Sequence, residues 1–153
     1  MFVTYTKQHN NYFKYSIIKI SEKMVNPIRI FEKYPKFSWF IVILIAGAIF
    51  FVSSLTFPPG QVSFGWKSLV YHFSAFFFFG FFLIISIIKG NKKNIFLLIL
   101  LSALFAIIYA ISDEFHQLFV PGRACSFSDI LVDSAGILSA SFLYSLSLKF
   151  RKK

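Results

Sequence analysis

The chain lacks most of what a soluble or secreted fold requires. Only 14% of its 153 residues are charged, and just six of them are acidic. Cys125 is the single cysteine, so no disulfide can form within the chain and a disulfide-stapled scaffold is excluded. Hydrophobic residues make up 57%, which argues against a disordered chain and exceeds what a soluble domain of this length can bury. These features favour an integral membrane protein.

Four long apolar runs carry the hydrophobic content. Each is near the ~20 residues that a helix needs to cross a bilayer, and each is continuous, which favours helices over alternating strands. The runs cover residues 39–55, 69–88, 95–112 and 130–148, and the third is expected to stay helical to residue 120, just before Pro121-Gly122. We predict an all-α, polytopic bundle of four transmembrane helices within residues 38–150.

Two basic segments flank this domain. Residues 1–37 are expected to form a cytoplasmic lead, disordered in part, and residues 151–153 a basic tail. Met24 is a candidate alternative start, because the residues before it show no clear pattern. The first apolar run is long for a signal peptide and no small-residue cleavage site follows it, so we expect a retained helix.

The net charge of +10 is explained by membrane orientation. Fourteen of the sixteen Lys and Arg residues lie before the first run, between the second and third runs, or after the fourth. The positive-inside rule then places both termini in the cytoplasm. Because these charges flank helices and form no single stripe, we predict contact with membrane lipids and no nucleic-acid partner.

Polar residues gather at the opposite, outer ends of the predicted helices. Helix spacing places Asp113 and Gln117 on one stripe of the third helix, above three alanines, and Asp129 and Asp133 on one stripe of the fourth, above Gly136. We expect these two stripes to face each other or a shared cavity. The residues predicted to form a binding site are Asp113, Glu114, Gln117, Arg123, Ser126, Asp129 and Asp133.

This outer layer permits two interpretations. In the first it is a structural clamp, in which Arg123 bridges the carboxylates. In the second it is a binding or catalytic site, with His72, Glu114 and Asp133 as candidate acid–base residues. No His-x-x-x-His or paired-cysteine spacing is present, so the sequence predicts no metal site. Cys125 is expected to be inert, because little around it would lower the pKa of its thiol.

The segment around these residues resembles the signature of the VanZ-like membrane protein family. The resemblance rests on the acidic pair Asp113-Glu114, on Gln117, on the turn Pro121-Gly122-Arg123, and on Ser126, Asp129, Asp133 and Gly136. His72 is similar to a histidine in the second helix of that family, which an Asp-Lys pair usually precedes. Here Trp66-Lys67 keeps the Lys and lacks the Asp.

The resemblance implies a small multi-pass protein of the plasma membrane, without an assigned reaction, in a family associated with teicoplanin resistance. We expect it to recognise a polar lipid or lipid-linked glycan headgroup at the outer leaflet. The alternatives are an outer-leaflet enzyme using Glu114 or Asp133 with His72 as an acid–base pair or metal site, and a non-catalytic structural protein. A transporter would need an oligomer, since four short helices leave little room for a pathway. The sequence identifies no cofactor.

Overall fold

The structure, a computed structural model, describes residues 19, 27–56, 65–91 and 93–151. Within these residues it is all-helical, as predicted. Four long helices are apolar enough to span a membrane: α2 (Pro35–Ser53), α3 (Trp66–Ile88), α4 (Ile95–Gln117) and α5 (Phe127–Arg151). The expectations for most of the basic lead, for Met24 and for the last two residues lie outside the described residues.

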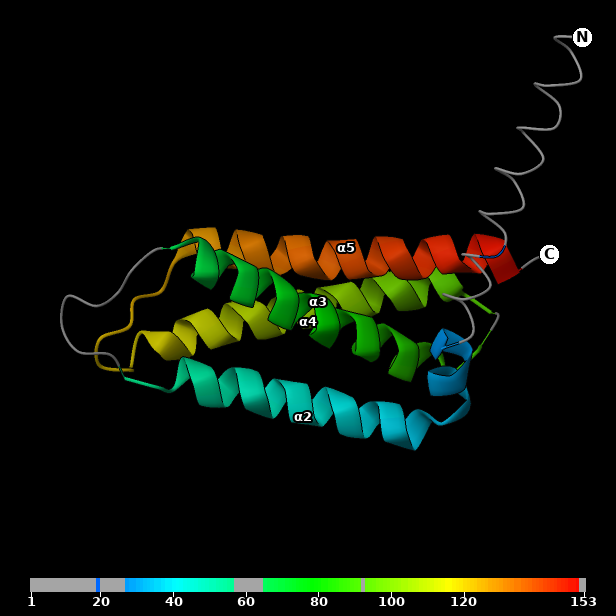
Figure 1. Cartoon of the computed structure of the whole chain (residues 1–153), viewed down its shortest axis with the longest axis horizontal. Helices are drawn as coiled ribbons and strands as arrows, with labels where there is room; N and C mark the ends of the chain where they lie inside the picture. The colour runs from blue at the N-terminus through cyan, green and yellow to red at the C-terminus, as the bar shows by residue number, and fades with distance from the viewer. Residues whose placement is uncertain (1–18, 20–26, 57–64, 92, 152–153) are drawn as a thin grey trace, which may run out of the picture.

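The helices run alternately up and down, with short connections between α3 and α4 and between α4 and α5 (Figure 1). We call the end where α2 and α4 finish and α3 and α5 begin the polar end. The opposite end, where α2 and α4 begin, is the basic end. A helical segment, residues 27–33, precedes α2 there. All the predicted outer-layer residues lie at the polar end.

Several helix boundaries differ by a few residues from the predicted runs, and two of the differences have a clear physical cause. The helix α4 stops at Gln117 and not at residue 120, because Leu118 to Val120 donate their backbone N–H groups to carbonyls three residues back. The residue before a proline is disfavoured in helical conformation, so the chain turns ahead of Pro121. The helix α2 begins earlier than predicted, at Pro35, since proline suits the first turn of a helix.

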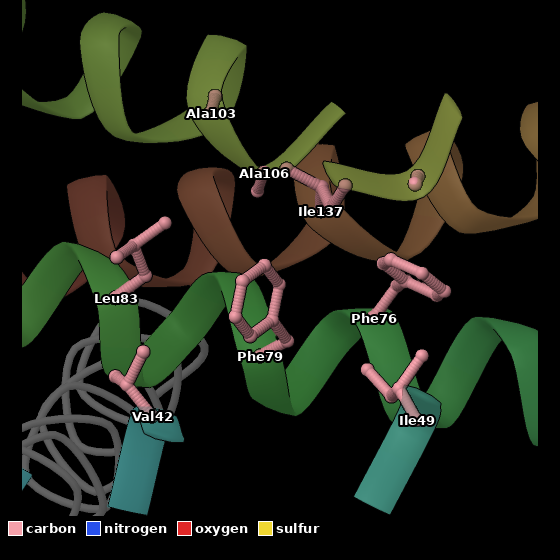
Figure 2. Close-up of a cluster of buried hydrophobic side chains, with 9 residues drawn as sticks. Val42, Ile49, Phe76, Phe79, Leu83, Ala103, Ala106 and Ile137 are labelled. Carbon is pink, nitrogen blue, oxygen red and sulfur yellow. The ribbon is translucent and has the colours of Figure 1, made fainter. Parts of the chain in front are cut away.

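The core lies between all four helices (Figure 2). Phe76, Phe79 and Leu83 of α3 pack against Ile137 of α5, and small residues of α4 close the other side. Phe78, in the same phenylalanine run, is 52% exposed. The run therefore fills the core on one face of α3 and meets the surroundings on another, which in a membrane are lipid chains.

The closest helix approach is between α3 and α5. A Cβ atom added at Gly136 would lie 2.5 Å from the carbonyl oxygen of Phe73, too close for any side chain. Gly80 of α3 also faces the backbone of α5, but a Cβ atom added there would lie 3.4 Å from the Cα atom of Ile137, which is an ordinary contact distance. Small residues at a membrane-helix interface permit such approach. The stripe of α5 therefore packs on α3 as well as facing α4, a neighbour that the sequence did not predict.

A polar contact secures the basic end. Glu32, in the segment before α2, accepts hydrogen bonds from Tyr144 Oη at 2.6 Å and from Arg151 at 2.8 Å. All three residues are remote from the polar end, and Glu32 and Tyr144 are buried. Residues 27–33 are thus joined to the last turns of α5.

Candidate functional site

Three helices bring His72, Glu114 and Asp133 together at the polar end. His72 lies in the second turn of α3, Glu114 in the last turn of α4 and Asp133 in the second turn of α5. One nitrogen or oxygen atom from each lies within 4.8 Å of the others, and all three residues are buried. The three candidate acid–base residues therefore form one cluster, which we call the triad.

The close packing of α3 on α5 explains how two members of the triad meet. Gly136 is one turn along α5 from Asp133, and its neighbour Phe73 directly follows His72. Because no Cβ atom separates the helices at Gly136, the His72 and Asp133 side chains reach each other across the interface.

The His72 imidazole lies between two carboxylates of α5. Its Nδ1 atom is 3.0 Å from Asp133 Oδ1, and its Nε2 atom is 3.9 Å from Asp129 Oδ2. The first distance is a hydrogen bond and the second is a looser ionic contact. The two aspartates, one turn apart on α5, thus hold opposite edges of the ring and limit its rotation.

A second group of hydrogen bonds orients the acidic pair of α4. Gln117 donates to Asp113 Oδ2 at 3.3 Å and to Glu114 Oε1 at 3.0 Å. Ser53, at the end of α2, donates to Asp113 Oδ1 at 2.7 Å, and the backbone N–H of Ser126 donates to Glu114 Oε2 at 2.9 Å. Both oxygens of each carboxylate therefore have a partner.

Asp133 is the exception among these carboxylates. Its side chain is 1% exposed, and in the described part of the protein its Oδ2 atom is buried without a hydrogen-bond partner. An unsatisfied buried acceptor costs about 1–3 kcal/mol, and more when it carries charge. This oxygen belongs to the carboxylate that contacts His72, so the acceptor without a hydrogen-bond donor lies within the triad.

The hydrogen bonds described for Arg123 reach the end of α2. Its Nη2 atom donates to the carbonyl of Val52 at 2.6 Å and its Nε atom to that of Leu55 at 3.2 Å. Val52 lies in the last turn of α2 and Leu55 just beyond its end, so the guanidinium is favourably placed at the negative end of the helix dipole. The structure thus shows a role for Arg123 in capping α2, which the sequence pattern did not predict.

Several residues that sequence reasoning omitted take part in the layer. Ser53 contacts Asp113, and Ser54 contacts His116 Nε2 at 3.1 Å. His116 also stacks on Phe50, so this second histidine belongs to the α2–α4 contact and not to the triad. The serine pair at the end of an otherwise apolar run was the available signal. Ser126 takes part through its backbone, while its hydroxyl pairs with Ser128.

The layer offers hydrogen-bond acceptors in excess of donors. The carboxylates of Glu114, Asp129 and Asp133 lie close to one imidazole, and Asp113 adds a fourth carboxylate to the layer. Such a site suits a ligand that brings positive charge or hydrogen-bond donors. An imidazole with two carboxylates is also a donor set that divalent metal ions accept. No other cofactor is indicated by the residues present.

Neither curated proteins nor solved structures show a significant match to this chain. A family model does match: the one described as VanZ/LLP1 covers residues 1–148, nearly the whole length. The match extends beyond the segment around α4 and α5 that carries the signature and includes every helix described above. With its four membrane-spanning helices and its polar layer, this multi-pass membrane protein belongs to the VanZ/LLP1 family.

Proposed function

We propose that this protein acts at the plasma membrane by binding the polar headgroup of an envelope lipid in the outer leaflet. The observation that carries the proposal is the acidic polar layer at one end of a membrane bundle, with the buried Asp133 Oδ2 left unpartnered. Buried polar groups within membrane helices are costly and commonly mark functional sites. The orientation follows from the basic residues at the opposite end.

The chemistry of the layer limits which headgroups are good candidates for binding. The layer is rich in carboxylates, so it favours a headgroup with N–H or O–H donors, such as an ammonium or a sugar hydroxyl. Asp129 is the best placed to make first contact. It lies in the first turn of α5, its side chain is 13% exposed, and it is more accessible than Asp133.

Lipid-dependent thermal stability tests this proposal. The full chain in detergent is melted with short-chain phosphatidylethanolamine, phosphatidylglycerol or phosphatidylcholine, of which only the first two carry N–H or O–H donors. Binding to the folded state raises the melting temperature by mass action. We expect a rise with a donor-bearing lipid, a smaller rise for Asp129→Asn, and an unchanged rise for Glu32→Gln at the basic end. Equal shifts with all three lipids would contradict the proposal.

A link to glycopeptide resistance is proposed from the family alone. Expression in a teicoplanin-susceptible Gram-positive host should reduce susceptibility, and Asp129→Asn should lose this effect at equal abundance in the membrane. Unchanged susceptibility with wild-type protein present would refute the link to resistance. It would not bear on headgroup binding, which the lipid melting experiment tests.

The contact between His72 Nδ1 and Asp133 Oδ1 favours a second candidate, an outer-leaflet enzyme. A carboxylate that orients an imidazole prepares it for proton transfer, and Glu114 lies within reach as a further acid or base. Lipid extracts from cells expressing wild-type protein or His72→Gln would then differ in at least one species. Identical extracts would count against catalysis.

A further inference from the structure

The triad has the composition of a metal site. It supplies one imidazole nitrogen and two carboxylate oxygens from three different helices, all buried. Tetrahedral ligands at ~2.1 Å from a zinc ion are about 3.4 Å apart. The observed separations, at most 4.8 Å, therefore require only small side-chain movements to enclose an ion.

The unpartnered oxygen is an independent observation that favours a positively charged ligand at the triad. Asp133 Oδ2 is buried and has no donor among the described residues, although its carboxylate lies in the midst of polar side chains. A cation bound at Asp133 would satisfy this oxygen, whereas the hydrogen bond from His72 satisfies only Oδ1. The local charge also favours a cation, because the carboxylates of Glu114 and Asp129 lie close to the same imidazole as Asp133.

The residues around the triad are arranged as supporting groups for such an ion. Glu114 is oriented by Gln117 and by the backbone of Ser126. An ion bound to His72 Nδ1 would replace that atom's hydrogen bond to Asp133 and leave the proton on Nε2, which faces Asp129. Metal-binding histidines usually donate their second ring N–H to a carboxylate or carbonyl in this way.

We propose that His72, Glu114 and Asp133 bind a divalent first-row transition-metal ion, with Zn²⁺ or Mn²⁺ as the best matches to this donor set. Imidazole disfavours Mg²⁺ and Ca²⁺, which select oxygen ligands. The ion would neutralise the charges of the two buried carboxylates of the triad. Metal binding requires no lipid, so this inference stands or falls separately from headgroup recognition.

Direct metal analysis of the full chain tests the inference. Tag-free protein in detergent is stripped with a chelator, loaded with Zn²⁺ and freed of excess ion by gel filtration. We expect stoichiometric Zn²⁺ on the wild type, and Co²⁺ in place of Zn²⁺ should give a visible d–d absorption band. Mg²⁺ at the same concentration should not displace the Co²⁺. Folded wild-type protein that retains no ion would overturn the proposal.

Single substitutions test which residues bind the metal ion. Glu114→Gln and His72→Gln should lose the ion, and Asp129→Asn should bind it about 10- to 100-fold more weakly, as a supporting residue. His116→Gln and Cys125→Ser, which alter a histidine and a cysteine near this end but outside the triad, should bind as the wild type does. Loss of the ion in His116→Gln or Cys125→Ser would place the metal elsewhere. If His72→Gln fails to fold, Asp129→Asn and the wild-type Co²⁺ band still decide the question.

Discussion

At the scale of single residues, two aspartates of the polar layer have contrasting environments. Both oxygens of Asp113 accept hydrogen bonds, from Ser53 and from Gln117. Asp133 has one oxygen on His72 and one without a partner. Both are aspartates within two turns of the polar end of a helix, so the difference comes from their neighbours. The contacts of Asp113 join α2 to α4, whereas Asp133 keeps one oxygen that the proposed metal ion would contact.

This contrast predicts the effect of removing each charge in metal-free protein. Asp113→Asn should lower the free energy of unfolding by about 1–2 kcal/mol, since charge-assisted hydrogen bonds are lost. Asp133→Asn should cost less, because it removes a charge that is only half satisfied. Thermal melting in detergent with chelator present measures both. A larger loss for Asp133→Asn would show that the layer is a structural clamp.

Arg123 and His116 mark the limit of residue-level prediction at this site. Both lie close in sequence to the acidic residues, and spacing alone assigned Arg123 to the carboxylates. In the fold both turn toward α2, where Arg123 caps the helix end and His116 meets Ser54. Each of these contacts joins residues more than sixty positions apart in the sequence, so no local pattern could indicate them.

At the scale of helices, the α3–α5 contact at Gly136 determines whether the triad can form. Gly136→Ala would place a methyl group 2.5 Å from the Phe73 carbonyl oxygen, and backbone cannot move aside cheaply. We expect a loss of about 1–3 kcal/mol in unfolding free energy, as for other overpacked sites. The same variant should also weaken Zn²⁺ binding, because α5 moves Asp133 away from His72.

Gly47→Ala is the matched control for this prediction. A Cβ atom at Gly47, in the middle of α2, would meet nothing within 4 Å. Alanine in a helix is favoured over glycine by roughly 0.5–1 kcal/mol, so this variant should melt at the wild-type temperature or higher. Equal destabilisation by both substitutions would mean that helix propensity, and not the close approach at Gly136, governs the result.

At the scale of the whole molecule, the two ends of the bundle differ in charge. Among residues 27–56, 65–91 and 93–151, the basic end carries Arg29, Lys33, Lys36, Lys89, Lys93, Lys149 and Arg151, whereas the polar end carries Lys67 and Arg123. The positive-inside rule predicts that the basic end faces the cytoplasm. The acidic layer would then face the outside of the cell.

The single cysteine allows this orientation to be measured. Cys125 is exposed in the connection between α4 and α5, at the polar end. A membrane-impermeant maleimide should label it in intact cells. In a Cys125→Ser background, Asn91→Cys at the basic end should be labelled only after permeabilisation, since Asn91 is exposed there. The reverse labelling pattern would place the polar layer in the cytoplasm.

The sequence by itself determined the class, the number of spans and the level at which the polar residues lie. Those properties depend on hydrophobic run length and on charge position, which are local and one-dimensional. It also identified His72, Glu114 and Asp133 individually as chemically unusual, because ionisable groups within apolar helices are costly.

Only the tertiary structure decided which of these residues meet. The rotation of each helix and the approach at Gly136 set the contact between His72 and Asp133, and they leave Asp133 Oδ2 without a partner. The same packing brings Arg123 to the end of α2, a contact that spacing did not suggest. Pairing across helices depends on interhelical packing, which the period of a single helix does not encode.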